Sequence, residues 1–289
     1  MTPDLDLLYH LALRGDWERA QTAGVYEMST LGMTFAEVGF VHASFAHQVK
    51  ATADRFYVGR DDVVLLSIDP ARLPSHPVVE AMEGSDEGFP HLFMPLATDA
   101  VVDVAAVAPA SDGRLDLPDF DPPTEVSFEM GRLTVDDAVA AAAVNSRSSV
   151  AGFGHVFPAD AAPPALGLLV ELWRGWLDDS GQVGHAARTL EGRLIGIGIS
   201  RTDVTDPRTG HVAKIYVEPW FWRLGVARAI SGACLGDLRG RGFERATLHV
   251  LARNLRARTW YERLGWVESV HPLEQVDGHL LEVEYGLAL

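Results

Sequence analysis

Residues 215–227 read IYVEPWFWRLGVA and combine a strand end, a turn and a helix start. The β-branched and aromatic run predicts a strand that ends at Val217, and the Glu-Pro pair after it predicts a turn. Gly225 and Ala227 are small enough for a ligand to approach the backbone closely. The first N–H groups of the following helix lack helical partners and carry the positive end of its dipole, so this turn suits a pyrophosphate.

A second segment, residues 254–266, reads NLRARTWYERLGW and predicts another helix. Asn254 can cap this helix, and Ala257, Tyr261 and Leu264 lie on one face at spacings of four and three residues. A Gly-x-Ala turn is common by itself, because glycine also permits an ordinary tight turn. The second segment, in this order and at this separation, makes the combination far more specific.

The two segments together resemble the GNAT superfamily of acyl-CoA-dependent N-acyltransferases, and the resemblance covers about residues 126–289. It implies acetyl-CoA as the cosubstrate and a splayed sheet in which strand 211–217 offers free backbone groups to pantetheine. It also places the pyrophosphate on the loop after this strand. The cofactor-binding residues that it implies are Ile215, Tyr216, Val217, Arg223, Leu224, Gly225, Val226, Ala227, Asn254 and Ala257.

The same resemblance places Tyr261 beside the thioester sulfur. A phenol with a pKa of ~10 can protonate the departing thiolate, whereas the alternative for Tyr261 is a core aromatic with one satisfied hydroxyl. The family usually has Gln or Arg three residues before the first glycine of the loop, and this chain has Trp222 there, with Arg223 one step later. Backbone amides can still bind phosphate, so we expect cofactor binding to persist.

Acyl transfer to an amine also needs a group that takes the proton of the amine. In family members with a base on the strand before the loop, the base stands six residues ahead of the last strand residue, and here this position is His211. Imidazole titrates in the right pH range, although an exposed histidine at a strand start needs no function. Glu171, Glu218 and His249 are further candidates. The histidines lack zinc-site spacing and a partner cysteine, so we expect no dedicated metal site.

Prolines and aspartates without a periodic apolar pattern gather at residues 108–124 and predict a domain boundary near residue 120. We expect an α+β protein of two domains: a small α+β domain at 1–117, a linker at 118–125, and a mixed sheet flanked by helices at 126–289. In the second domain we expect helices at 135–145, 164–178, 225–239 and 255–264, and strands at 126–133, 183–190, 193–201, 211–217, 245–251, 266–270 and 280–287.

The first domain contains unusual local sequences, among them LYH at 8–10, GFVHAS at 39–44 and FPHL at 89–92. They resemble the domain-of-unknown-function 952 family, which is thought to be similar in fold to ADP-ribosyltransferases and RNA phosphotransferases that bind NAD. The resemblance implies a cleft with NAD as a possible ligand. Its candidate lining residues are His10, His42, Ser44 and Tyr57, with Glu80 as a possible acid. Each of these side chains also fits ordinary packing.

The 289 residues carry a formal net charge of −16, which argues against nucleic acid or an anionic membrane as a partner. Residues 1–120 hold −12 of this charge, whereas residues 223–263 contain nine arginines and carry a net +6. This basic segment coincides with the loop and helices assigned to the CoA phosphates, and some of its arginines could meet a phosphate. For most of the nine arginines, a solvated face of two amphipathic helices is the favoured explanation. The single cysteine, Cys234, has apolar neighbours and fits core packing in a reducing compartment.

We find no signal-peptide-like start and no apolar stretch of the ~18 residues that a membrane span needs, so a cytoplasmic location is the expectation. Our leading hypothesis is an acetyl-CoA-dependent N-acetyltransferase that transfers directly to an unidentified small-molecule or peptide amine. The acidic surface favours a cationic amine. Trp222 leaves open a non-catalytic CoA-binding sensor module, and the first domain leaves open an NAD-linked transferase activity.

Overall fold

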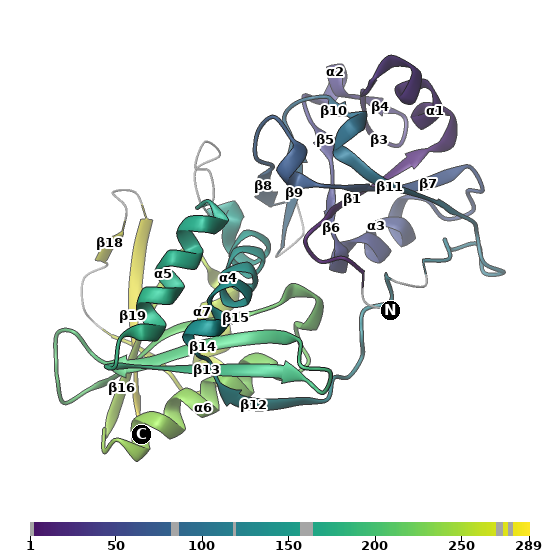
Figure 1. Ribbon diagram of the computed structural model, residues 1–289. Coiled ribbons are helices and arrows are strands. Elements are labelled where there is room, and N and C mark those ends of the chain that lie inside the picture. The colour runs from purple at the N-terminus through teal and green to yellow at the C-terminus, as the bar shows by residue number, and fades with distance from the viewer. Residues whose placement is uncertain (1–2, 82–86, 118–119, 157–163, 270–273, 277–279) are drawn as a thin grey trace. The chain divides into compact units, whose positions relative to one another are not determined.

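The computed structural model describes residues 3–81, 87–117, 120–156, 164–269, 274–276 and 280–289 (Figure 1). The chain divides into two compact units: unit 1 comprises Met1–Pro123 and Pro158–Pro163, and unit 2 comprises Thr124–Phe157 and Pro164–Leu289. Both units contain helices and strands, so the expected α+β class with two domains is confirmed. Residues 118–119 of the expected linker lie outside the described residues. Within the described ranges, no helix is long and apolar enough to cross a membrane.

Unit 1 is built on two antiparallel sheets, with the strand orders β11-β7-β1-β6 and β5-β9-β8. Two short strand pairs, β10 with β2 and β3 with β4, complete it. Its strands are β1 (Leu8–Leu13), β2 (Val25–Tyr26), β3 (Met28–Thr30), β4 (Met33–Thr34), β5 (Val41–His42), β6 (Ser44–Phe45), β7 (Val63–Ile68), β8 (Val78–Ala81), β9 (Gly88–Leu92), β10 (Leu96–Ala97) and β11 (Val101–Val107). Its helices are α1 (Arg14–Ala23), α2 (Phe35–Val38) and α3 (Val49–Phe56).

The core of unit 1 determines which side chains the smaller sheet presents. Strand β7 reads VVLLSI and is buried along its whole length, as expected for a strand covered on both faces. Val41 of β5 and Leu92 of β9 belong to the same buried core. Because side chains alternate along a strand, the adjacent His42 and His91 project from the opposite face of the smaller sheet.

Unit 2 contains one sheet of eight strands in the order β12-β13-β14-β15-β16-β19-β17, with β18 paired to β19. The neighbours are antiparallel except for β15 and β16, so the sheet is mixed. Its strands are β12 (Phe128–Arg132), β13 (Gln182–Thr189), β14 (Leu194–Thr202), β15 (Gly210–Val217), β16 (Arg245–Leu251), β17 (Val267–Glu268), β18 (Glu274–Val276) and β19 (Leu280–Ala288). Its helices are α4 (Ala138–Phe153), α5 (Leu166–Asp178), α6 (Val226–Gly240) and α7 (Leu255–Arg263).

Helices cover both faces of this sheet, α4 and α5 on one face and α6 on the other (Figure 1). On the first face, Ile199 of β14 packs in a core cluster with Trp173 of α5. On the second face, Gly198 lets α6 approach, since a Cβ added there would lie 2.5 Å from Cγ2 of Ile230. Cys234 of α6 is fully buried, and burial raises the pKa of its thiol, which confirms the expected packing role. The expected mixed sheet flanked by helices is also confirmed.

Strands β15 and β16 separate soon after they meet. They pair at Gly210 with Ala246 and at His211 with Thr247, whereas β15 continues to pair with β14 as far as Val217. Among the described residues, the backbone of 212–217 therefore has no ladder partner on its β16 side. The splay that the sequence resemblance implied is present at this point.

Candidate functional site

The loop between β15 and α6 leaves a helix N-terminus open. Arg223 has a φ of 67° and Gly225 a φ of 85°, so both residues adopt the left-handed conformation that non-glycine residues rarely occupy. An atom added at the Cβ position of Gly225 would meet nothing within 4 Å. The first helical bond of α6 runs from the N–H of Ala229 to the carbonyl of Gly225, and no side chain caps the helix. The preceding N–H groups can therefore bind an anion.

Trp222, the residue that departs from the family pattern, brings a cation from another helix to this loop. Its Nε1 donates a hydrogen bond of 2.8 Å to the carbonyl of Val217, which ties the loop to the end of β15. The guanidinium of Arg256, in α7, lies 4.0 Å from the centre of the Trp222 ring. This contact joins residues 34 positions apart, so patterns within one sequence segment do not reveal it. The only available signal was the presence of Arg256 in the second segment.

Tyr261 lies half-buried on α7, among aromatic rings. The centre of its ring is 6.0 Å from that of Trp266 and 6.5 Å from that of Tyr285. Burial, with smaller contributions from Cys234 and Tyr216, raises the pKa of the Tyr261 hydroxyl above its usual value. Within the described part of the chain, this hydroxyl makes no hydrogen bond, so its proton is available to a ligand.

Asn254 begins α7 as a cap: its Oδ1 accepts a hydrogen bond of 3.1 Å from the N–H of Ala257. This geometry confirms the capping role inferred from the sequence. It also fixes the start of the helix that carries both Arg256 and Tyr261. Contact of Asn254 or Ala257 with a cofactor stays a prediction.

His211 is buried at the start of β15 rather than exposed, so the alternative of a plain surface histidine is wrong. Its Nδ1 lies 2.9 Å from Oγ1 of Thr247, and the same hydroxyl donates to Asp203 at 2.5 Å. Because that hydroxyl has one proton, it must accept from Nδ1–H of His211, which leaves Nε2 unprotonated. Burial lowers the pKa of His211 to about 4. The imidazole is therefore a neutral, oriented proton acceptor, ~20 Å along the strand from Val217.

The other candidate bases have partners of their own. Glu218 is 2% exposed and its carboxylate lies 2.8 Å from the guanidinium of Arg147 in α4. Glu171 is exposed on α5 and pairs with Arg174 at 2.6 Å. His249 lies 3.6 Å from Glu284 on the neighbouring strand. These interactions give each residue a structural role.

Lys214 is a further polar residue of this region, outside the set of candidates predicted from the sequence. It is one of two lysines in the chain and stands in the centre of β15. Its Nζ lies 4.7 Å from the ring centre of Trp176 in α5. Burial lowers the pKa of the Lys214 ammonium, while the charge of Glu282 acts in the opposite direction. A lysine within the apolar run of a predicted strand was the available signal.

In unit 1, the structure brings His10 and His42 together. Nδ1 of His10 lies 2.6 Å from the carbonyl oxygen of His42, and Nε2 of His10 lies 3.1 Å from the hydroxyl of Tyr26. Burial lowers the pKa of His10 to about 4, so the ring is neutral. Ser44 and Tyr57 bond elsewhere: the first hydroxyl lies 3.3 Å from that of Thr52, and the second donates to the carbonyl of Leu11 at 2.8 Å.

Glu80 reaches a histidine that the candidate set omitted. Its Oε2 lies 2.7 Å from Nδ1 of His91, and the ring of His91 is 5.0 Å from the ring of His42. Burial lowers the pKa of both imidazoles. The signal for His91 was its place in the FPHL sequence at 89–92. Glu80, His91, His42 and His10 therefore form one cluster.

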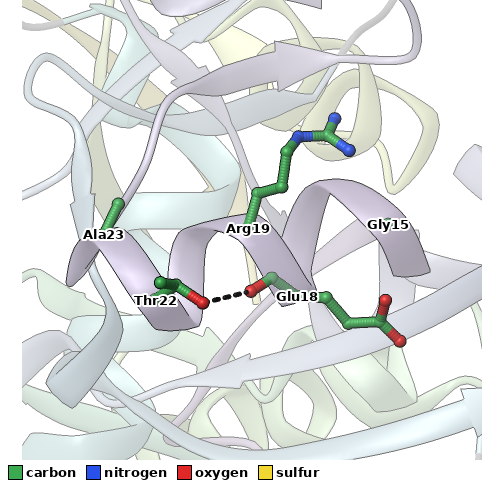
Figure 2. Close-up of a pocket in the computed structure, with 5 residues that line it drawn as sticks. All are labelled: Gly15, Glu18, Arg19, Thr22 and Ala23. Carbon is green, nitrogen blue, oxygen red and sulfur yellow. Dashed lines mark hydrogen bonds between the residues drawn. The ribbon is translucent and has the colours of Figure 1, made fainter.

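A hollow on the outer face of α1 involves neither group of residues (Figure 2). Gly15, Glu18, Arg19, Thr22 and Ala23 line it, and all five belong to this helix. Its one hydrogen bond drawn in Figure 2 joins the Thr22 hydroxyl to the Glu18 carbonyl at 3.3 Å. Among the described residues, no three His, Cys, Asp or Glu side chains gather into a metal site. The candidate chemistry therefore lies at the splayed strands and in the histidine cluster.

Two family models match the chain, one in each unit. The acetyltransferase (GNAT) family matches residues 152–266, which include the loop, α6 and α7. Unit 2 is thus similar to this family over residues 152–266. The family described as protein of unknown function (DUF952) matches residues 11–104 in unit 1.

Individual relatives are similar to parts of the chain. Mycothiol acetyltransferase from Beutenbergia cavernae is 38% identical over 69 residues, which are 24% of this chain and 23% of that protein, so the chain spans about a quarter of its length. Protein CC0527 from Caulobacter crescentus is 31% identical, with 39% of this chain and 96% of that chain covered and a TM-score of 0.36. The ribosomal-protein-S18-alanine N-acetyltransferase from Escherichia coli is 20% identical, with 56% and 94% covered and a TM-score of 0.42.

Proposed function

We propose that the protein is an acetyl-CoA-dependent N-acetyltransferase that transfers the acetyl group directly to an amine. The observation that carries this proposal is the open N-terminus of α6 directly after the strand that separates from its neighbour. Free backbone groups of residues 212–217 would receive pantetheine, and the first N–H groups of α6 would receive the pyrophosphate. Arg256, stacked on Trp222, would supply a nearby positive charge.

The side chains of unit 2 supply the proton transfers that this reaction needs. Acetyl-CoA, when bound, supplies an acyl group activated as a thioester. Tyr261 keeps its proton at neutral pH because its pKa is raised, and it can donate that proton to the departing sulfur. His211 has an unprotonated Nε2 and can take the proton of the amine, directly or through water.

The acceptor that we propose is a small-molecule or peptide amine. The relatives above are named for mycothiol and for the alanine of a ribosomal protein, which represent both classes. Glu282 and Glu284 lie on β19 beside His249, and their carboxylates favour a cationic amine. Spermidine and a peptide with a free basic N-terminus are therefore suitable first acceptors.

Release of free thiol from acetyl-CoA tests this function. The full chain is incubated with acetyl-CoA and a panel of amines that contains spermidine, an aminoglycoside and basic peptides. We expect thiol release that depends on an amine and forms one N-acetyl product per thiol. Binding of acetyl-CoA without release of thiol for any amine would instead favour a non-catalytic CoA-binding sensor. Trp222, which stands where the family usually has Gln or Arg, is the residue that left this alternative open.

A further inference from the structure

The smaller sheet of unit 1 carries a pair of imidazoles that the proposed acetyl transfer does not use. His42 of β5 and His91 of β9 are directly opposite each other in register, so their side chains leave the same face of the sheet. Their ring centres are 5.0 Å apart and the ring planes are inclined by 74°. Phe40 contacts both rings and stacks on His91 at 4.0 Å. The pair is therefore a compact feature of the fold.

One nitrogen of each ring already has a partner. Nδ1 of His91 lies 2.7 Å from the carboxylate of Glu80, which can only accept when ionised, so this nitrogen carries the proton. Nδ1 of His42 lies 3.0 Å from the hydroxyl of Ser29. His91 is 5% exposed, and its Nε2 is buried without a hydrogen-bond partner in the described structure. A buried acceptor without a partner points to a missing ligand.

The charge around the imidazoles of His42 and His91 indicates which kind of ligand they would bind. In the described residues, no hydrogen bond or ion pair joins a lysine or arginine to either imidazole, and residues 1–120 carry a net charge of −12. An anion is therefore disfavoured and a cation is favoured. Imidazole nitrogens suit zinc, copper and nickel ions. A carboxylate on the second ring nitrogen, as Glu80 provides for His91, is the usual arrangement behind a metal-binding histidine.

The separation of the rings also fits one shared ion. With metal–nitrogen distances of ~2.0–2.1 Å and tetrahedral angles, two imidazoles on one zinc ion have ring centres about 5 Å apart. We propose that His42 and His91 bind one divalent transition-metal ion through their Nε2 atoms, with Glu80 as a positioning residue. No third His, Cys, Asp or Glu of the described chain completes the set. Water or a substrate would supply the remaining ligands of the ion.

Titration of zinc chloride or nickel chloride into the full chain, followed by calorimetry, tests the proposal. We expect one ion per chain for the wild type. His42→Gln and His91→Gln should each weaken binding at least tenfold, whereas His76→Gln, at an exposed histidine of the same unit, should leave binding unchanged. No saturable binding by the wild type, or equal affinity in His91→Gln, would overturn the proposal.

Nuclear magnetic resonance of the imidazole nitrogens covers the case in which a variant folds poorly. In the wild type, zinc should shift the Nε2 signals of His42 and His91 more than their Nδ1 signals. Glu80→Ala should bind zinc several-fold more weakly with the same stoichiometry, and its His91 should lose the fixed Nδ1–H form. Zinc-induced shifts confined to other histidines would contradict the site. None of these measurements involves acetyl-CoA, so they are independent of the proposed transferase.

Discussion

The proposed proton transfers depend on single residues. Substitution of Tyr261 tests them most directly. Tyr261→Phe keeps the ring that packs against Trp266 and Tyr285 and removes only the acidic proton. We expect kcat to fall at least about tenfold, since general acid catalysis contributes ~10²–10⁴. Affinity for acetyl-CoA should change less than about twofold. Steady-state thiol release and calorimetry give the two values.

A tyrosine outside the site provides the control for this experiment. Tyr9 lies in unit 1, where its hydroxyl donates to the carbonyl of Asp4. Tyr9→Phe should therefore leave both kcat and affinity as in the wild type. If Tyr261→Phe turns over as fast as Tyr9→Phe, Tyr261 does not protonate the leaving group.

The buried His211 predicts how stability depends on pH. Its pKa falls from 6.5 in the unfolded chain to about 4 in the folded chain, so the unfolded state binds the proton first as the pH falls. The contribution of the neutral His211 to the free energy of unfolding is complete above pH ~6.5 and is lost progressively as the pH falls to about 4. Between pH 7 and pH 5 this amounts to about 2 kcal/mol.

Urea unfolding at pH 7 and pH 5, followed by tryptophan fluorescence, measures this loss. The signal reports mainly on unit 2, because Trp17 is the one tryptophan of the sequence that lies in unit 1. His211→Gln should lose about 2 kcal/mol less than the wild type between the two pH values. His76→Gln should behave as the wild type. An unchanged pH dependence in His211→Gln would mean that His211 is not held neutral.

Sequence reasoning at the residue scale found residues near one another in the chain and missed those joined by the fold. The glycine of the loop and the cap at Asn254 are local features, and local rules identify them. His91 and Arg256 become significant only through His42 and Trp222, which lie far away in the sequence. Spacing rules cannot reveal such pairs, because they examine one segment at a time.

Most helices and strands of unit 2 were predicted from the sequence, whereas β18 was missed and the strand expected at 266–270 is only Val267–Glu268 (β17) in the structure. Strand β16 has the predicted bounds 245–251, and α6 begins one residue after the predicted start. Helix α4 extends to Phe153, whereas the alanine-rich pattern predicted an end at residue 145. The polar run after it continues the helix because Asn145 accepts from Trp173 at 3.1 Å and Arg147 pairs with Glu218. Tertiary partners override local propensity here.

The close contact between α6 and β14 predicts that a larger side chain at Gly198 destabilises unit 2. Gly198→Ala places a methyl group 2.5 Å from Cγ2 of Ile230, so the helix or the strand must move. We expect a loss of about 1–3 kcal/mol in the free energy of unfolding. Gly236→Ala is the matched control, since Gly236 lies in α6 with nothing within 4 Å. It should raise stability by about 0.5–1 kcal/mol. Equal stability of the two variants in urea would contradict the packing described.

The whole molecule consists of two units with separate relatives and separate candidate sites. The net charge of −16 is the sum of unequal parts: residues 1–120 are strongly acidic, whereas the segment 223–263, which contains the end of the loop and all of α6 and α7, is basic. Composition and linker pattern predicted two α+β domains, and the structure agrees. The ADP-ribosyltransferase-like fold and NAD binding of unit 1 stay predictions, because the comparisons give them no support.

Binding of acetyl-CoA to the loop before α6 is the central claim, and calorimetry with two glycine variants tests it most directly. Gly225→Glu and Gly192→Glu both place a side chain at a left-handed glycine with free space around it, so their backbone strain is similar. Gly192 lies in the β13–β14 turn, away from the loop sequence. We predict that the wild type and Gly192→Glu bind one acetyl-CoA per chain and that Gly225→Glu binds none. Equal binding by Gly225→Glu and Gly192→Glu would contradict the claim.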